Sequence, residues 1–161
     1  MTYAIIGSGA IGTALATQFA RNNVDVLVAN SRGPASVSDL AGKLGDNIKP
    51  VSVEAAANAD VVILAVPFGS VPDAVGGVSD WAGRVVVDAT NAIDFPTFTP
   101  KDLGGRLSTE IVAEAVPGAR VVKASTLCQP PCWPPIPSRT VDIASCFCRA
   151  TTRTRTSSWP I

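Results

Sequence analysis

The sequence has 161 residues, of which 47% are hydrophobic and 16% are charged, and its formal net charge is zero. This length and composition predict one folded domain with a substantial core, and the balanced charge gives no sign of the basic surface that favours binding to nucleic acid or to an anionic membrane. The sequence contains no histidine, which excludes histidine-based catalytic triads and most catalytic zinc sites.

An apolar strand that runs into a glycine-rich turn and then into a helix opens the chain. Residues 3–6 precede a Gly-x-Gly-x-x-Gly motif, and residues 13–22 continue at helical spacing. Gly7 permits the tight turn, Gly9 lets the backbone approach a phosphate, and Gly12 lets the helix pack closely on the strand. Because the start of a helix attracts anions, we expect a pyrophosphate here; the alternative is an ordinary glycine-rich turn. The cofactor-binding residues expected in this segment are Gly7, Ser8, Gly9, Ala10, Ile11 and Gly12.

A second predicted strand, residues 24–29, completes a β-α-β unit and ends at a short polar segment. In a site for NAD, an acidic residue near this position accepts a hydrogen bond from the ribose hydroxyl. This sequence instead has Asn30, Ser31 and Arg32. A serine hydroxyl can donate to a phosphate and an arginine can pair with it, so the segment favours NADP over NAD. The alternative is a solvated loop, because arginine is common on protein surfaces.

The segments that follow continue the alternation of helices and strands. Ser36 or Ser38 is expected to cap a helix that stops at Gly45. Residues 51–53 are a candidate strand, and residues 54–58 are an alanine-rich helix.

An almost uninterrupted apolar strand is predicted for residues 60–67, and such a strand is buried on both faces in the interior of a parallel sheet. Ligands bind at the carboxyl ends of the strands in open sheets of this kind. We therefore expect Val66, Pro67 and Phe68 to line the nicotinamide half of a cleft. The alternative is that Pro67 only ends the strand and Phe68 only packs in the core.

Residues 84–91 form the next predicted inner strand, which ends in polar side chains. Thr90 and Asn91 are expected to hydrogen-bond the cofactor or the substrate, and Asp88 is expected to anchor the loop. A purely structural turn is the alternative, since Asn and Asp favour turns by themselves. The aromatic and proline residues of the loop at 93–98 are expected to form a wall or lid over a planar ring, or else to cover core.

The alternation of strand and helix continues to residue 124. A weak helix is predicted for residues 70–75, a longer one begins at Ser108, and residues 120–124 form one more strand. This pattern predicts an α/β fold with a Rossmann-type doubly wound parallel sheet, in which residues 1–124 form an NADP-binding domain.

Several short motifs occur in a defined order along the chain. They are the glycine motif, Asn30-Ser31-Arg32-Gly33-Pro34, Leu64-Ala65-Val66-Pro67, Val87-Asp88-Ala89-Thr90-Asn91, Ser108-Thr109-Glu110 and Val121-Val122-Lys123-Ala124. Together they resemble the NADPH-dependent F420 reductase family (NADP oxidoreductase, coenzyme F420-dependent). The resemblance implies that the domain holds NADP (NADPH) and exchanges hydride with a deazaflavin, coenzyme F420, or with a similar acceptor at the carboxyl edge of the sheet. It implies no particular catalytic residue.

The composition changes abruptly after Ala124. All four cysteines and two of the three tryptophans fall within residues 125–161, together with many prolines. We expect neither a metal site nor disulfides there, because the rest of the chain has the character of a cytoplasmic protein and the proline pairs resist a regular scaffold.

Our hypothesis is that one base was lost after the Ala124 codon, so that residues 125–161 form an out-of-frame, disordered tail and the sheet is truncated and incomplete at its C-terminal end. When the codons are regrouped, those of Cys132 and Trp133 force Leu and those of Trp133 and Pro134 force Ala. Both residues agree with the sequence expected for the family at these positions. A divergent extension is the alternative.

A cytoplasmic location is expected, because the chain does not open with a basic region, an apolar run and a cleavage site. The expected partners are a small-molecule hydride donor or acceptor and a second copy of the chain in a homodimer, with no nucleic acid, membrane or metal. The alternative function is a nucleotide-binding module without catalytic turnover, either a sensor or a truncated product.

Overall fold

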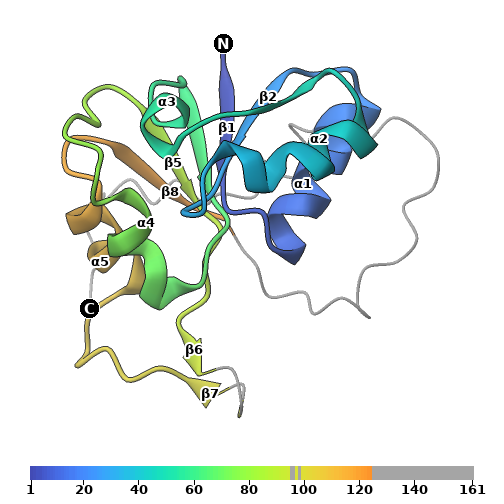
Figure 1. The fold of residues 1–161 in the computed structure, drawn as a ribbon. Coiled ribbons are helices and arrows are strands. Elements are labelled where there is room, and N and C mark those ends of the chain that lie inside the picture. The colour runs from blue at the N-terminus through green and yellow to red at the C-terminus, as the bar shows by residue number, and fades with distance from the viewer. Residues whose placement is uncertain (95–96, 98, 125–161) are drawn as a thin grey trace, which may run out of the picture. The chain divides into compact units, whose positions relative to one another are not determined.

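A computed structural model describes residues 1–94, 97 and 99–124. The predictions for Phe95, Pro96, Phe98 and residues 125–161, including the out-of-frame tail, therefore lie outside the described residues. The described chain forms one six-stranded sheet with helices on both faces, and a separate two-stranded hairpin (Figure 1).

The large sheet is parallel throughout and has the order β3-β2-β1-β4-β5-β8. From β1 the chain moves outward to β2 and β3 on one side, and then returns to add β4, β5 and β8 on the other. The strand order therefore reverses between β1 and β4, which is where open α/β sheets bind their ligands. The predicted Rossmann-type doubly wound parallel sheet is confirmed. Its strands are β1 (Tyr3–Ile6), β2 (Val26–Ala29), β3 (Ile48–Pro50), β4 (Val61–Leu64), β5 (Val85–Asp88) and β8 (Arg120–Lys123).

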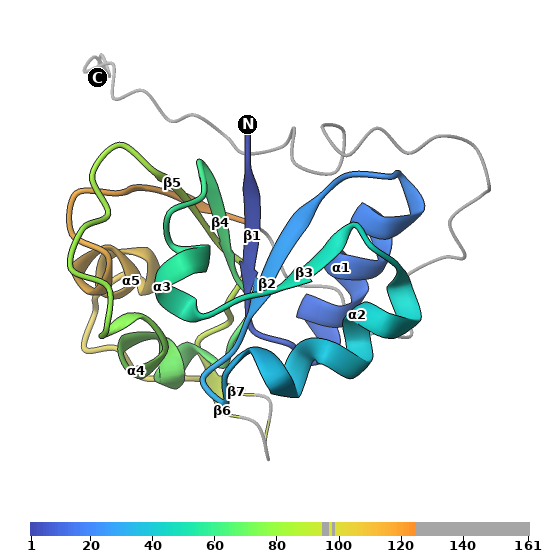
Figure 2. The ribbon, with the colours of Figure 1, turned by 45° about the horizontal axis from the view of Figure 1, so that its top comes forward.

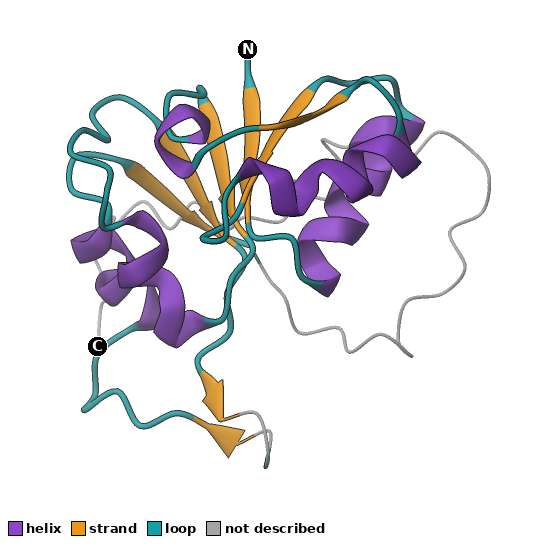
Figure 3. Ribbon diagram, in the orientation of Figure 1, coloured by secondary structure: helices purple, strands orange, loops and turns teal. Residues whose placement is uncertain are grey.

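Helices cover the two faces of the sheet (Figures 2 and 3). The helices α1 (Ala10–Arg21) and α2 (Ser38–Leu44) lie on one face. The other face carries α3 (Val53–Ala56), α4 (Val71–Val75) and α5 (Ser108–Ala115). Within the described ranges, none of these helices has the length and apolar character that crossing a bilayer demands.

The core consists of two clusters, one on each face of the sheet. Successive residues of a strand point to opposite faces, so neighbours in β1 enter different clusters. Ala4 and Ile6 pack under α3, α4 and α5, whereas Ile5 packs with Ala16 and Phe19 of α1. The inner strands are apolar on both faces because both faces are covered.

Two local predictions between β2 and β4 were wrong. Residues 51–53 do not form the strand; β3 lies just before them, and Ser52 caps α3 by accepting a hydrogen bond from the Ala55 N–H at 3.2 Å. Neither Ser36 nor Ser38 caps α2 through its side chain. A 3-10 turn, η1 (Pro34–Val37), leads directly into α2, and Pro34 starts that turn because its fixed φ suits a first helical position.

The loop after β5 contains a short antiparallel hairpin that the sequence did not predict. Its strands are β6 (Ile93–Asp94) and β7 (Thr99–Pro100), and they lie beyond the carboxyl ends of the parallel strands (Figure 1). As predicted, α4 is short and is followed by Gly76, and α5 begins at Ser108. The strands β4 and β5 end at Leu64 and Asp88, before the predicted ends at residues 67 and 91.

Candidate functional site

The turn after β1 is shaped by two glycines that leave no room for a side chain. Gly7 has a φ of +119°, and a Cβ there would lie 2.2 Å from the Ala65 carbonyl oxygen of the loop after β4. A Cβ on Gly12 would lie 1.8 Å from the Gly7 carbonyl oxygen. The tight turn and the close helix packing expected from the motif are therefore present, and only glycine fits at either position.

The first turn of α1 presents unused backbone N–H groups. Gly9 is its N-cap and stands open: within the described ranges, and apart from its chain neighbours, no heavy atom lies within 4 Å of the position a Cβ would take. The Gly9 carbonyl oxygen accepts from the Thr13 N–H at 2.8 Å, so the N–H groups of Ala10, Ile11 and Gly12 have no acceptor within the helix. No acidic side chain lies in this turn. These amides and the helix dipole favour an anion.

Asn30, at the end of β2, ties this turn to the next loop. Its side-chain Oδ1 accepts from the Arg32 backbone N–H at 2.9 Å and from the Ser36 hydroxyl at 2.8 Å. Because a backbone N–H can only donate, the amide orientation is set, and Nδ2 donates to Ser8 Oγ at 2.7 Å. Asn30 is 8% exposed and uses its polar atoms within the protein. It therefore holds the two loops in place, and the hydroxyl hydrogen of Ser8 remains available to another acceptor.

Ser31 and Arg32 are exposed at the corner that follows β2. In the described part of the chain, the Arg32 guanidinium forms no ion pair with an acidic side chain. An exposed arginine at this corner can bind a phosphate.

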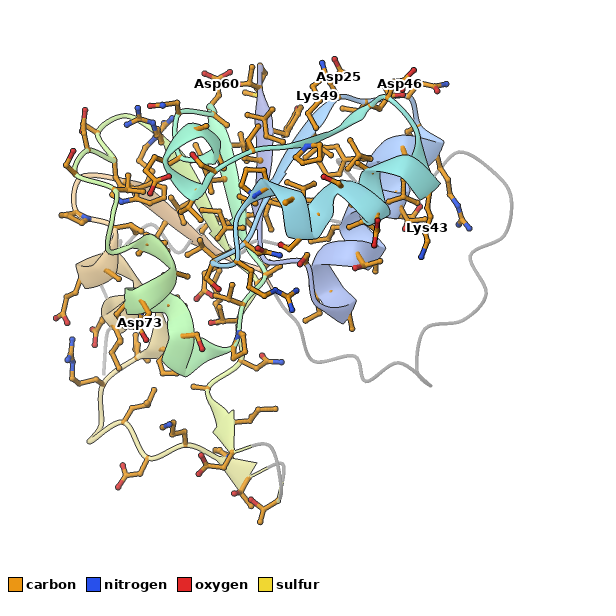
Figure 4. All side chains as sticks on the ribbon, viewed as in Figure 1. Asp25, Lys43, Asp46, Lys49, Asp60 and Asp73 are labelled. Atoms are coloured by element: carbon orange, nitrogen blue, oxygen red, sulfur yellow. The ribbon has the colours of Figure 1, made fainter. Side chains whose placement is uncertain are left out.

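A depression of about 260 Å³ adjoins this corner. Three segments that are distant in sequence line it: the loop after β2, the start of α3, and α4 with the residues after it. Figure 4 shows Asp73 on α4. The lining residues are Asn30, Ser31, Gly33, Ser52, Val53, Glu54, Asp73, Ala74 and Gly77.

The electrostatics of this depression differ from those of the corner. Its lining includes two acidic residues, Glu54 and Asp73. The backbone N–H of Glu54 and the Ser52 hydroxyl hold the pKa of the Glu54 carboxyl below its usual range, so this group is a carboxylate at neutral pH. Acidic side chains repel a phosphate and accept hydrogen bonds from N–H groups. The depression therefore suits a neutral group that carries donors.

The three residues after β4 that were predicted to line the cleft differ in their exposure to solvent. Val66 is half-buried and Pro67 is exposed, where it precedes the 3-10 turn η2 (Phe68–Ser70). Phe68 is buried in the core cluster under α4. Val66 and Pro67 thus remain candidates to contact a ligand, whereas Phe68 packs in the core.

The carboxyl ends of β5 and β8 carry a buried polar network. Asp88 is fully buried, and it anchors the loop after β5 by accepting from the Thr90 N–H at 2.8 Å and from the Thr90 hydroxyl at 2.7 Å. Lys123 donates to Asp88 Oδ2 at 2.9 Å. Asn91, which is half-buried, follows Thr90 in the same loop.

Four of the residues around the site were not among the predicted site residues. Glu54 and Asp73 lie on helices whose sequence signalled only helix formation, and Lys123 was recognised only as part of a strand motif. Ser36 was expected to cap a helix but instead hydrogen-bonds Asn30. Among the described residues, no three His, Cys, Asp or Glu side chains gather in a group that could hold a metal ion.

Comparison with known proteins adds a family and a set of relatives. Residues 2–92 match the model of the family described as NADP oxidoreductase coenzyme F420-dependent. A crystal structure of a hypothetical protein from Sinorhizobium meliloti is 60% identical, with a TM-score of 0.74 over 78% of this chain and 62% of that one. A structure from Arthrobacter sp., described as an F420-dependent NADP reductase, is 22% identical, with a TM-score of 0.58 over 76% of this chain and 61% of that one.

A curated relative from Ectopseudomonas mendocina, named glycerol-3-phosphate dehydrogenase [NAD(P)+], is 31% identical over 73% of this chain and 36% of its own length. The chain thus spans about three fifths of the two solved structures and little more than a third of the dehydrogenase. The 22% identity of the Arthrobacter structure supports the fold alone.

Proposed function

Since the chain belongs to the coenzyme F420-dependent NADP oxidoreductase family, we propose that it binds NADP(H) at the carboxyl edge of its sheet and takes part in hydride exchange with a deazaflavin, coenzyme F420, or a similar small-molecule acceptor. The observation that carries the proposal is the cradle formed by the turn after β1. A Cβ at Gly7 or Gly12 would collide with backbone, while Gly9 and the amides after it stay open, which is the shape that a pyrophosphate requires.

The corner after β2 supports the preference for NADP over NAD. The position that holds an acid in NAD sites is Asn30, whose side chain is engaged by Ser8, Arg32 and Ser36. No carboxylate at the end of β2 therefore repels a ribose phosphate, and the exposed Ser31 hydroxyl and Arg32 guanidinium supply donors for it. A phosphate bound at this corner would be stabilised by the several N–H donors of the planar guanidinium group.

The adjoining depression is the proposed place of the adenine. Its acidic residues, Glu54 and Asp73, disfavour a phosphate, whereas adenine carries an amino group that can donate to a carboxylate. Phosphate and base are thereby assigned to neighbouring places of opposite electrostatic character. The phosphate would then lie at Arg32 and the base between α3 and α4.

The nicotinamide half is proposed to lie along the loops after β4 and β5, against Val66, Pro67 and Asn91. Bound there, NADPH supplies the hydride. The protein contributes binding and orientation: the cradle holds the pyrophosphate, and the two loops flank the ring. That the chain forms a homodimer stays a prediction.

The proposal is tested by titrating the full-length protein with NADPH and with NADH, following the fluorescence of the reduced nicotinamide. Saturable binding with a clear preference for NADPH is expected. Hydride exchange is then measured with coenzyme F420 through the absorbance of the oxidised deazaflavin. Binding without exchange would favour a nucleotide-binding module without turnover, and a folded protein that binds neither nucleotide would refute the proposal.

A further inference from the structure

A buried ion pair joins the ends of the last two strands of the sheet. Asp88 ends β5 and Lys123 ends β8, and the two residues are register partners in this parallel pair. The Asp88 side chain has no solvent exposure, and that of Lys123 is 33% exposed. A carboxylate in this position must be fully hydrogen-bonded to be tolerated. Thr90 satisfies one of its oxygens through two hydrogen bonds, and Lys123 satisfies the other at 2.9 Å.

Lys123 does more than neutralise the carboxylate. Its ammonium group also donates to the Thr90 carbonyl oxygen at 2.7 Å, across 33 residues of sequence. The backbone of the loop after β5 is therefore held at Thr90 on both sides: its N–H by Asp88 and its C=O by Lys123. Because the peptide unit is planar, fixing the Thr90 carbonyl also fixes the direction of the next N–H, which belongs to Asn91.

Asp88 and Lys123 thus form a clamp on Thr90. This clamp lies at the edge of the sheet where open α/β folds bind ligands. Stability of the sheet alone does not require it, because the ladder between β5 and β8 already continues past Asp88 through the Ala124 N–H, which donates to the Asp88 carbonyl oxygen at 2.9 Å. A buried pair is also a weak source of net stability, since desolvation offsets most of its attraction. What the pair adds is a defined position for the loop that begins at Thr90.

We propose that Lys123 is a positioning residue for the nicotinamide half of the dinucleotide, and that together with Asp88 it clamps the Thr90 carbonyl and so sets the place of Asn91 against the ring. This inference rests on the proposed function, because it assumes that the dinucleotide lies along this edge. It assigns the clamp no contact with the adenine half, whose proposed contacts come from the loop after β2 and from α3 and α4.

The test compares two ligands that share the adenine half. NADPH carries the nicotinamide, whereas adenosine 2′,5′-bisphosphate carries only the base, the ribose and the two phosphates. The main variant is Asp88→Asn with Lys123→Met, which removes both charges and keeps an Oδ1 acceptor for Thr90. Lys123→Arg is the conservative variant, since it keeps the charge and the donors. Binding of both ligands is measured on the full-length chain, with circular dichroism to verify folding.

A matched control comes from the other end of the sheet. Lys49 and Asp25 form an ion pair of similar length, 3.0 Å, between β3 and the start of β2. Figure 4 shows both at the end of the sheet that also carries Asp60, far along the strands from the carboxyl edge. The variant Asp25→Asn with Lys49→Met therefore removes the same two charges, from a more exposed pair, without touching the loop after β5.

The expected result is selective. The Asp88→Asn, Lys123→Met protein binds NADPH about ten-fold more weakly, a loss typical of one charged hydrogen bond, and binds the bisphosphate as the unaltered protein does. Lys123→Arg retains most of the NADPH affinity. The control variant Asp25→Asn, Lys49→Met binds both ligands with unchanged affinity. If the double variant does not fold, Asp88→Asn alone is measured. It removes the anionic partner of Lys123 but leaves the Lys123 hydrogen bond to the Thr90 carbonyl oxygen, so a smaller loss with the same selectivity is expected.

Two results would overturn the inference. Unchanged NADPH affinity in a folded variant would show that the clamp does not position the ring, and equal weakening of both ligands would show a general structural role. Failure of the proposed function is a separate outcome, because the unaltered protein would then bind neither NADPH nor the bisphosphate.

Discussion

Replacing Gly12 by alanine tests the geometry of the cradle directly. The new Cβ would lie 1.8 Å from the Gly7 carbonyl oxygen and 2.8 Å from its carbonyl carbon, where 3.4–4 Å is ordinary contact. Both atoms belong to the backbone, so no change of rotamer relieves the overlap. Gly7 is itself held by its N–H, which donates to the Ala29 carbonyl oxygen at 2.8 Å, and by the closeness of Ala65. Either the turn or α1 must therefore move.

The size of the effect follows from two opposing terms. Alanine is better than glycine inside a helix by about 1 kcal/mol, whereas forcing extra volume into a packed site costs about 1–3 kcal/mol and more where backbone cannot yield. Because the overlap is with backbone, the larger cost applies, and we expect the unfolding free energy of Gly12→Ala to fall by about 2 kcal/mol or more, with a loss of NADPH affinity. Gly42 is the matched control, because it lies in α2 and, among the described residues outside its own helix backbone, no heavy atom lies within 4 Å of its Cβ position.

The assay is urea unfolding followed by far-ultraviolet circular dichroism, with the unaltered protein, Gly12→Ala and Gly42→Ala measured side by side. Gly42→Ala is expected to gain about 0.5–1 kcal/mol from helix propensity alone. The two substitutions should thus have opposite signs although the chemical change is the same. If Gly12→Ala were as stable as Gly42→Ala, the close packing of α1 against the turn after β1 would be refuted.

Four further predictions concern other parts of the chain. Arg32→Ala should weaken binding of NADPH much more than binding of NADH in fluorescence titrations, and equal weakening would show that Arg32 does not contact the ribose phosphate. Asn30→Ala removes three hydrogen bonds from a buried site, so urea unfolding should show a loss of about 1–3 kcal/mol; an unchanged midpoint would contradict its bridging role. The Thr2 backbone N–H and hydroxyl hold the pKa of the Asp60 carboxyl below its ordinary value of 3.8, so the stability that this group adds is present above that value and is lost as the pH falls through the lower, folded-state pKa. Asp60→Asn should remove that part of the acid dependence in unfolding curves measured between neutral pH and pH ~2, whereas parallel curves for the two proteins would argue against it. Sequencing the gene across the Ala124 codon should reveal a lost base, and an intact frame would rule out the out-of-frame tail.

The local features of the first crossover could be predicted because their causes lie within a few residues of one another. The Gly7 turn depends on a backbone conformation that only glycine adopts easily, and the following helix starts within the same short segment. The inner strands β4 and β5 were recognisable because burial on both faces requires an unbroken apolar run. The glycine turn and the apolar runs are visible in the sequence whatever tertiary structure buries the strands. Together they predicted the parallel sheet.

The roles of the polar residues depended on partners outside their own helix or strand. Ser36 was expected to cap a helix, but the folded chain places Asn30 within reach of its hydroxyl, and Asn30 in turn reaches Ser8 across 22 residues. The contact of Lys123 with Asp88 exists only because β8 pairs with β5. The sequence by itself thus determined the glycine turn and the strands, through backbone conformation and burial. Only the order of the strands decided which polar groups meet, because a hydrogen bond between distant segments depends on where the sheet brings them.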